Sequence, residues 1–210
     1  MNDSADQLVS LGDATVFVRR LFASPPKPGR PVLVFLHDSL GCVATWRDFP
    51  RALAERLNLD AVVYDRQGYG GSSPLGPAAR TPRYLEEQAE VLLALLDELA
   101  IDRAVLFGHS DGGSIALIAA GIAPERFSAI VTEGAHAFVE DRTLAGILAA
   151  REAFATTSLA ERLAKYHAVD SRRRAHTAPG RSRDSARRRG SLHRRVGRRA
   201  CACETPIDPR

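Results

Sequence analysis

The stretch Ala104–Gly121, AVLFGHSDGGSIALIAAG, constrains the fold of this 210-residue chain more than any other. It opens with the short apolar run Ala104–Phe107, which is typical of a strand buried on both faces. It then passes through glycine, histidine, serine, aspartate and glycine and becomes the small apolar run Ser114–Ala120, which favours a helix. The stretch therefore predicts a strand, a sharp turn around Ser110 and a helix.

The glycines two residues before and two residues after the serine complete the pattern G-x-S-x-G, which is typical of a nucleophile elbow. At such an elbow the turn is too tight for neighbouring side chains, so we expect that a Cβ at Gly108 or Gly112 would clash. A flexible Gly/Ser turn is the alternative, but the strand before the pattern and the helix after it favour the elbow. The turn would raise the Ser110 hydroxyl above the sheet and aim the N–H of Asp111 at a developing negative charge.

Apolar runs of strand length alternate with helical patterns along most of the chain. Strands are predicted at 15–21, 32–36, 61–64, 104–107 and 128–132, and helices at 49–57, after Pro82, and at 114–120, 141–154 and 159–166. This alternation predicts an α/β fold with a mostly parallel sheet flanked by helices. His37, Asp65 and Ser110 each follow the carboxyl end of a predicted strand, the edge where such sheets place their chemistry.

Five stretches occur in the order and spacing of one known family, namely 32–41 (VLVFLHDSLG), 46–50 (WRDFP), 62–73 (VVYDRQGYGGSS), 105–121 (VLFGHSDGGSIALIAAG) and 133–141 (EGAHAFVED). On these stretches the chain resembles the α/β-hydrolase fold family, and more narrowly its bacterial lysophospholipase-like members. The resemblance covers roughly residues 15–167. It implies a hydrolase core and a serine hydrolase, or esterase, that acts on small-molecule acyl or ester substrates. Nothing in the sequence indicates a metal or organic cofactor.

The resemblance also implies roles for particular residues. Ser110 matches the catalytic nucleophile of the family, and the N–H of Asp111 matches one donor of its oxyanion hole. The second donor comes from the loop that begins at His37, so either Asp38 or Ser39 is expected to supply it. The imidazole of His37 is expected to form a bulky, hydrogen-bonding wall of the pocket.

A serine hydroxyl becomes a good nucleophile only when a histidine accepts its proton and a carboxylate orients that histidine. In the family the acid and the histidine follow the serine, on loops beyond the cap helices. Neither loop is recognisable after His167, so the expected triad is incomplete. His136 follows a strand end and is expected to line the pocket; a role as substitute base is the less favoured alternative. His109, inside the elbow, is expected to point away from the substrate into packing.

From His167 onward, Arg, Ala, Ser, Gly and Pro supply 29 of 44 residues, and large apolar residues are rare. Because such a segment cannot bury a core, residues 168–210 are predicted to be a disordered basic tail on a domain of residues 1–167. The formal charge changes from −5 over residues 1–166 to +9 over the rest. GC-rich DNA translated out of frame yields this composition, and we hypothesise that the hydrolase is truncated or frameshifted after about residue 167.

Two functions from different classes follow. The first is a serine hydrolase of ester or related acyl substrates, impaired because the late acid and histidine are missing. The alternative is a non-enzymatic remnant with an uncovered sheet edge, whose basic tail binds anions or nucleic acid nonspecifically. The tail contains no aromatic residues for base stacking, which argues against a selected nucleic-acid role.

Several features bear on the cellular compartment. No apolar run reaches the roughly eighteen residues of a membrane span. The N-terminal MNDSADQLVS is acidic and lacks the basic segment of a secretory signal. The three cysteines form neither a disulfide framework nor a zinc motif. These features predict a cytoplasmic protein.

Overall fold

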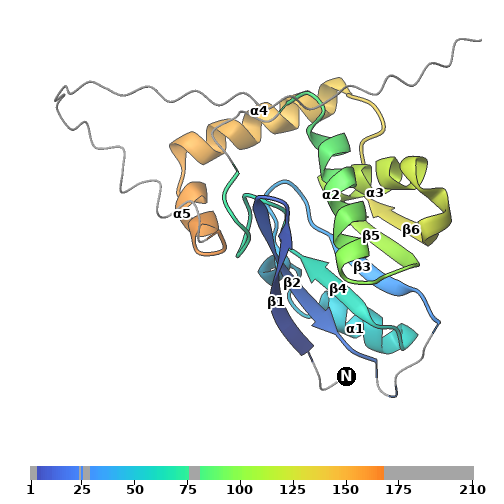
Figure 1. The fold of residues 1–210 in the computed structure, drawn as a ribbon. Helices are drawn as coiled ribbons and strands as arrows, with labels where there is room; N and C mark the ends of the chain where they lie inside the picture. Colours follow the sequence, from blue (N-terminus) through green and yellow to red (C-terminus); the bar gives the residue numbers. More distant parts are fainter. Residues whose placement is uncertain (1–3, 24, 26–28, 76–80, 168–210) are drawn as a thin grey trace, which may run out of the picture. The chain divides into compact units, whose positions relative to one another are not determined.

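The computed structural model describes residues 4–23, 25, 29–75 and 81–167, and a mixed sheet forms the core of this part of the chain (Figure 1). Its strands are β1 (Ser4–Leu11), β2 (Ala14–Leu21), β3 (Val32–Leu36), β4 (Ala61–Tyr64), β5 (Ala104–His109) and β6 (Phe127–Glu133). They lie in the order β1-β2-β4-β3-β5-β6. β4, β3, β5 and β6 are parallel, whereas the β1–β2 hairpin joins β4 in antiparallel orientation. The predicted α/β fold with a mostly parallel sheet is confirmed.

The described residues also form five helices and two short 3-10 turns. The helices are α1 (Phe49–Leu57), α2 (Tyr84–Glu98), α3 (Asp111–Ile122), α4 (Asp141–Thr156) and α5 (Leu159–Ala164), and the turns are Val43–Trp46 and Pro124–Arg126. In Figure 1, α2 and α3 lie on one face of the sheet and α1 lies on the other. The chain divides into Met1–Thr177 and Ala178–Arg210, and every described residue belongs to the first unit.

Alternate residues of each central strand face opposite cores, as the period of two in a strand requires. On the face of α2 and α3, Val34 and Leu36 of β3 pack in a cluster with Leu92 and Ile115. On the other face, Phe35 belongs to a second cluster with residues of α1 and its flanking loops. Because both faces of the sheet are covered at β3 and β4, these strands are continuous apolar runs. Such runs can be recognised in the sequence.

The sequence analysis located β3, β4 and α1 with the bounds that the structure has. It missed β1, a polar strand in which only Val9 is buried. β1 lies at one edge of the sheet, so most of its side chains face solvent and show no apolar alternation. Its hairpin turn to β2 contains Gly12 with φ of +59°, a backbone conformation that suits glycine.

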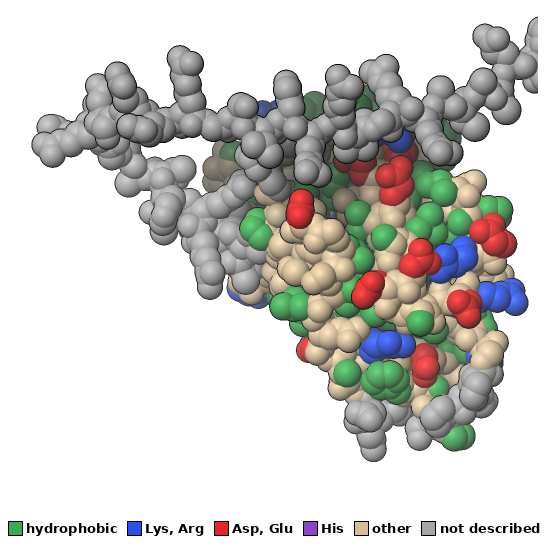
Figure 2. Space-filling view, viewed as in Figure 1, with side chains coloured by type: hydrophobic (Ala, Val, Ile, Leu, Met, Phe, Trp, Pro, Cys, Tyr) green, Lys and Arg blue, Asp and Glu red, His purple; other side chains and the backbone are tan. Residues whose placement is uncertain are grey.

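β6 lies at the other edge of the sheet, where an uncovered edge was expected. Its residues are exposed or half-buried, with Val131 47% exposed, and α4 has no buried residue. Figure 2 shows acidic, basic and apolar side chains interspersed over the described part of the face it presents. Within the described residues no helix is long and apolar enough to cross a membrane. The basic tail predicted at residues 168–210 lies outside the described residues.

Candidate active site

Ser110 lies between the end of β5 and the start of α3, in a backbone conformation rare for residues other than glycine. Its φ is 52° and its ψ is −119°, and such a conformation costs about 1–3 kcal/mol. Its N–H donates to the Glu133 carbonyl at 2.8 Å, and its carbonyl accepts from the N–H groups of Gly113 and Ser114 at 2.9 and 3.1 Å. These bonds hold the strained turn, as a nucleophile elbow requires.

The two flanking glycines are required by close backbone contacts. A Cβ at Gly108 would overlap the carbonyl group of Gly112, because the strand and the helix cross there. A Cβ at Gly112 would overlap the carbonyl group of Leu36, at the end of β3. The expected clash at both positions is confirmed. The close approach at Gly112 places the elbow next to the end of β3 and the loop that follows it.

Hydrogen bonds to the Asp38 carbonyl hold the loop that follows β3. The Asp38 carbonyl accepts hydrogen bonds from the His37 Nδ1–H at 2.7 Å and from the Arg66 Nη2–H at 2.7 Å. It also accepts from the Gly41 N–H at 3.3 Å. In a trans peptide the carbonyl and the following N–H point in opposite directions. The N–H of Ser39 therefore points away from His37 and Arg66.

His37 is 1% exposed and lies beneath this loop rather than beside open space. Its Nε2 accepts from the Arg66 N–H at 3.1 Å, which leaves the proton on Nδ1 for the Asp38 carbonyl. Its ring meets Tyr69 edge-on, with centroids 4.9 Å apart. The hydrogen bonds of His37 therefore connect the loop after β3 to the loop after β4.

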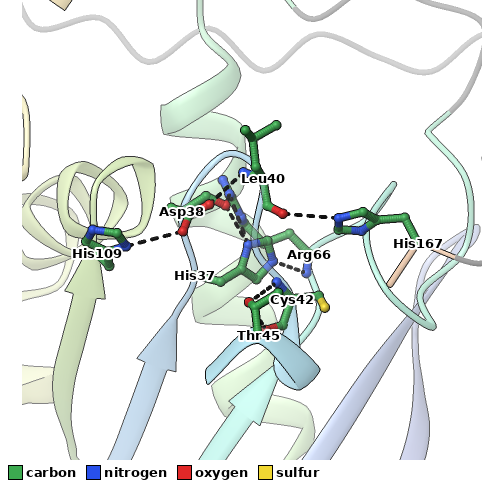
Figure 3. Close-up of polar contacts among 8 residues, drawn as sticks. All are labelled: His37, Asp38, Leu40, Cys42, Thr45, Arg66, His109 and His167. Atoms are coloured by element: carbon green, nitrogen blue, oxygen red, sulfur yellow. Dashed lines mark hydrogen bonds and ion pairs between the residues drawn. The ribbon is translucent and has the colours of Figure 1, made fainter. Parts of the chain in front are cut away.

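Asp38 also reaches the elbow through its side chain. One carboxylate oxygen accepts from the Leu40 N–H at 2.6 Å, and the other lies 3.3 Å from Nδ1 of His109. Figure 3 shows His109 on one side of this cluster and His167 on the other. The expectation that His109 points into packing was wrong: its side chain is 41% exposed and faces Asp38. The imidazole contacts the carboxylate of Asp38, which is 71 positions away in sequence. A pattern of burial along the chain does not reveal such a contact.

Helix α3 begins at Asp111, whose carboxylate lies 3.9 Å from Nη1 of Arg66. The first-turn N–H groups of a helix have no intrahelical partner and carry partial positive charge. The N–H of Asp111 is therefore available to a negatively charged group above Ser110.

Asp65 and Arg66, the first residues after β4, both hold loops, and within the described residues no ion pair joins them. The Asp65 carboxylate accepts from the N–H groups of Val43 at 2.6 Å and Gly71 at 2.8 Å. Burial raises the pKa of Asp65, and these two backbone bonds act in the opposite direction.

His136 lies after β6 with an exposed side chain. Its backbone is anchored by the buried hydroxyl of Ser114, which bonds to both its N–H and its carbonyl at 2.9 Å. No imidazole of the described residues hydrogen-bonds to the Ser110 hydroxyl. His109 is engaged with Asp38, and His167 is engaged with Leu40.

His167 contributes to the site and was missed by the sequence analysis. Its Nδ1 accepts from the Gly70 N–H, and its Nε2–H donates to the Leu40 carbonyl, both at 3.1 Å. The partner residues lie 97 and 127 positions away in sequence, so no local pattern could reveal them. Beside it lies a cavity of about 280 Å³ lined by Ser39, Leu40, Gly68, Tyr69, Phe154, Ala160, Leu163, Ala164 and His167.

The described residues contain no group of three or more His, Cys, Asp or Glu side chains placed to hold a metal ion. Cys42 follows the same loop and is buried, and this burial raises the pKa of its thiol. A thiol with a raised pKa forms little of the reactive thiolate. Ser110 is therefore the better nucleophile candidate.

The elbow and its sheet have counterparts in known proteins. The sequence model described as alpha/beta hydrolase fold matches residues 31–192. The chain belongs to the α/β-hydrolase fold family. The match ends beyond residue 167, where the sequence analysis placed the end of the resemblance.

Similar proteins of this hydrolase family carry different names. One is the "Dihydrolipoyllysine-residue acetyltransferase component of acetoin cleaving system" of Pseudomonas putida, 36% identical over 62% of this chain and 34% of that protein. Another is an epoxide hydrolase of Caballeronia sordidicola, 37% identical over 48% of this chain and 30% of that protein.

Among solved structures, a carboxylesterase of Nitrososphaera gargenis has a TM-score of 0.62 at 20% identity, over 76% of this chain and 56% of that chain. That likeness shows the fold. This chain spans about a third of the length of the two curated relatives.

Proposed function

We propose that Ser110 is the nucleophile of a hydrolase that acts on small-molecule esters or related acyl compounds. The observation that carries this proposal is the strained backbone of Ser110 between a parallel strand and the N-terminus of α3. That conformation lifts the hydroxyl out of the sheet and leaves the N–H of Asp111 beside it, where an oxyanion would form.

The second oxyanion donor in this proposal is the N–H of Ser39 rather than that of Asp38. The Asp38 carbonyl is held by Arg66 and His37, so the N–H of the same peptide plane, which belongs to Ser39, points the other way. The loop itself contacts the elbow, because the His37 carbonyl, directly after β3, also lies against Gly112.

Acyl chemistry is favoured over epoxide opening by the identity of the nucleophile. A serine oxygen that attacks an acyl carbon forms an ester, which water can hydrolyse to regenerate the enzyme. The same oxygen attacking an epoxide carbon would form an ether, which water does not cleave under mild conditions. The cavity beside Ser39, with lining residues such as Leu40, Phe154 and Leu163, suits an apolar acyl group.

We further propose that turnover by this chain is low. Removing a triad member typically lowers kcat by about 10⁴- to 10⁶-fold, and no described imidazole contacts the Ser110 hydroxyl. The alternative, a non-enzymatic remnant, is favoured by the exposed strand β6 and the unburied α4. Cytoplasmic localisation and nonspecific nucleic-acid binding by residues 168–210 remain predictions.

The experiment is covalent labelling of the purified chain with a fluorophosphonate probe, followed by peptide mass spectrometry. We expect slow labelling at Ser110 that is abolished in Ser110→Ala and unchanged in Ser128→Ala, a matched exposed serine on β6. Labelling distributed over several serines, or equal labelling of Ser110→Ala, would favour the remnant. Rapid ester turnover that depends on Ser110 would contradict the proposed low activity.

A further inference from the structure

Arg66, the second residue after β4, is an arginine with no exposed surface. Its Nη1 donates to the Tyr84 hydroxyl at 3.3 Å, and its guanidinium carbon lies 5.0 Å from the ring centroid of Tyr69. Its Nε is buried without a hydrogen-bond partner among the described residues. The one carboxylate paired with this guanidinium among the described residues, that of Asp111, is 3.9 Å away. A buried cation that is so weakly paired and has an unpaired N–H destabilises a fold. Folds tolerate such costs mainly at functional sites.

Besides Tyr84 and His37, the guanidinium reaches two groups that are next to the proposed oxyanion donors. Nη2 donates to the Asp38 carbonyl at 2.7 Å, and that carbonyl shares a peptide plane with the N–H of Ser39. Nη1 lies 3.9 Å from the carboxylate of Asp111, the residue that supplies the other N–H. Figure 3 shows Arg66 beside Asp38 and His37 at the centre of the cluster.

The charges around the site give this arrangement a second consequence. Asp38 and Asp111 both carry carboxylates beside the place where an oxyanion would form, and negative charges there oppose its formation. His109 faces the carboxylate of Asp38, and Arg66 faces that of Asp111. The Arg66 guanidinium has no exposed surface, so water screens its charge little.

We propose that Arg66 is the positioning residue of the oxyanion site, an inference that rests on the proposed function of Ser110. It holds the Asp38–Ser39 peptide so that the Ser39 N–H faces the site, and it offsets the Asp111 carboxylate. Arg66 acts through these residues and does not itself touch the substrate.

The test compares Arg66→Gln with Arg126→Gln in the full chain. Arg126 is a matched control, because it also bridges loop carbonyls, those of Ile101 and Asp102, and pairs with Asp97. That network follows α2, away from Ser110. Two readouts are measured below the unfolding temperature of each variant: the fluorophosphonate labelling rate of Ser110, and hydrogen exchange of the backbone amides of residues 37–42.

Arg66→Gln is expected to lower the labelling rate about 100-fold or more, as loss of an oxyanion donor does, and to speed exchange at 37–42. Arg126→Gln is expected to change neither readout, even where it lowers the unfolding temperature. A folded Arg66→Gln variant that labels at the wild-type rate, or whose exchange at 37–42 is unchanged, would overturn the inference.

Two further cases remain decisive. If Ser110 of the wild-type chain is not labelled at all, the proposed function fails, and exchange at 37–42 alone decides whether Arg66 positions the loop. If Arg66→Gln does not fold, Tyr84→Phe replaces it, because it removes only the hydroxyl that accepts from Nη1. We expect labelling of Ser110 to be a few-fold slower and exchange at 37–42 to be faster in Tyr84→Phe. If neither readout changes, the inference is overturned.

Discussion

At the scale of single residues, the elbow depends on an absent side chain. Gly112→Ala would drive a Cβ into the backbone of Leu36, which cannot move without displacing β3. We expect a loss of about 3 kcal/mol or more in the free energy of unfolding, measured by urea denaturation.

Gly121 provides the control for this substitution within the same helix. A Cβ there meets nothing within 4 Å, so Gly121→Ala should stabilise α3 by about 0.5–1 kcal/mol. Equal effects of the two substitutions would contradict the close approach of α3 and β3.

Asp65 is a buried carboxylate whose ionisation should be visible in the stability of the protein. Burial raises its folded-state pKa, so between the unfolded pKa near 3.8 and the raised folded value the native state binds more protons. Stability contributed by Asp65 is therefore greatest at low pH and falls as the pH rises through this window.

Asp65→Asn should remove this part of the pH dependence. The amide must turn its NH₂ toward the N–H of Val43 or Gly71, so we also expect an overall loss of about 1–3 kcal/mol. Urea unfolding at several pH values from about 4 to 7 measures both effects. An unaltered pH slope in the variant would show that Asp65 does not titrate as its burial implies.

At the scale of elements, His167 connects the end of α5 to two loops of the sheet. Its two hydrogen bonds, to the Gly70 N–H and the Leu40 carbonyl, require a neutral imidazole with the proton on Nε2. His167→Ala should loosen α5 by about 1–3 kcal/mol.

Trypsin cleavage at Arg162 and Lys165, both at the end of α5, measures this loosening. We expect cleavage to be about tenfold faster or more in His167→Ala, the rate equivalent of 1.4 kcal/mol. His136→Ala, which removes an exposed imidazole, should leave the cleavage rate unchanged. Unchanged cleavage in His167→Ala would show that other contacts hold α5.

At the scale of the whole molecule, the contrast between residues 1–166 and the basic residues that follow predicts two separable behaviours. Deleting residues 168–210 removes a net charge of +9 and leaves the formal charge at −5, so salt-sensitive retention on immobilised DNA should disappear. The unfolding transition should stay within a few degrees of that of the full chain, which calorimetry measures. Retention that survives the deletion would place the anion-binding surface on the sheet domain.

The frameshift hypothesis remains a prediction that the coding DNA tests. His167 is hydrogen-bonded to two loops of the core, so we expect the hydrolase reading frame to extend at least to that residue. If another frame downstream of it encodes buried strands with a late acid and a late histidine, the hypothesis stands. If no frame does, the basic segment is genuine coding sequence.

The sequence by itself determined the elements whose chemistry is local. The apolar runs of β3, β4 and β5, the helix α1 and the glycines at 108 and 112 follow from burial and backbone sterics, which neighbouring residues express. The sequence analysis missed β1 because an edge strand buries little and leaves no apolar pattern.

Only the tertiary structure decided how the site is held together. The contacts of Arg66 with Asp38 and Asp111, of His109 with Asp38, and of His167 with Leu40 and Gly70 join residues from different loops. Such pairs depend on which strand ends the sheet order brings together. Because polar side chains choose partners by proximity in space, no spacing along the chain could predict them.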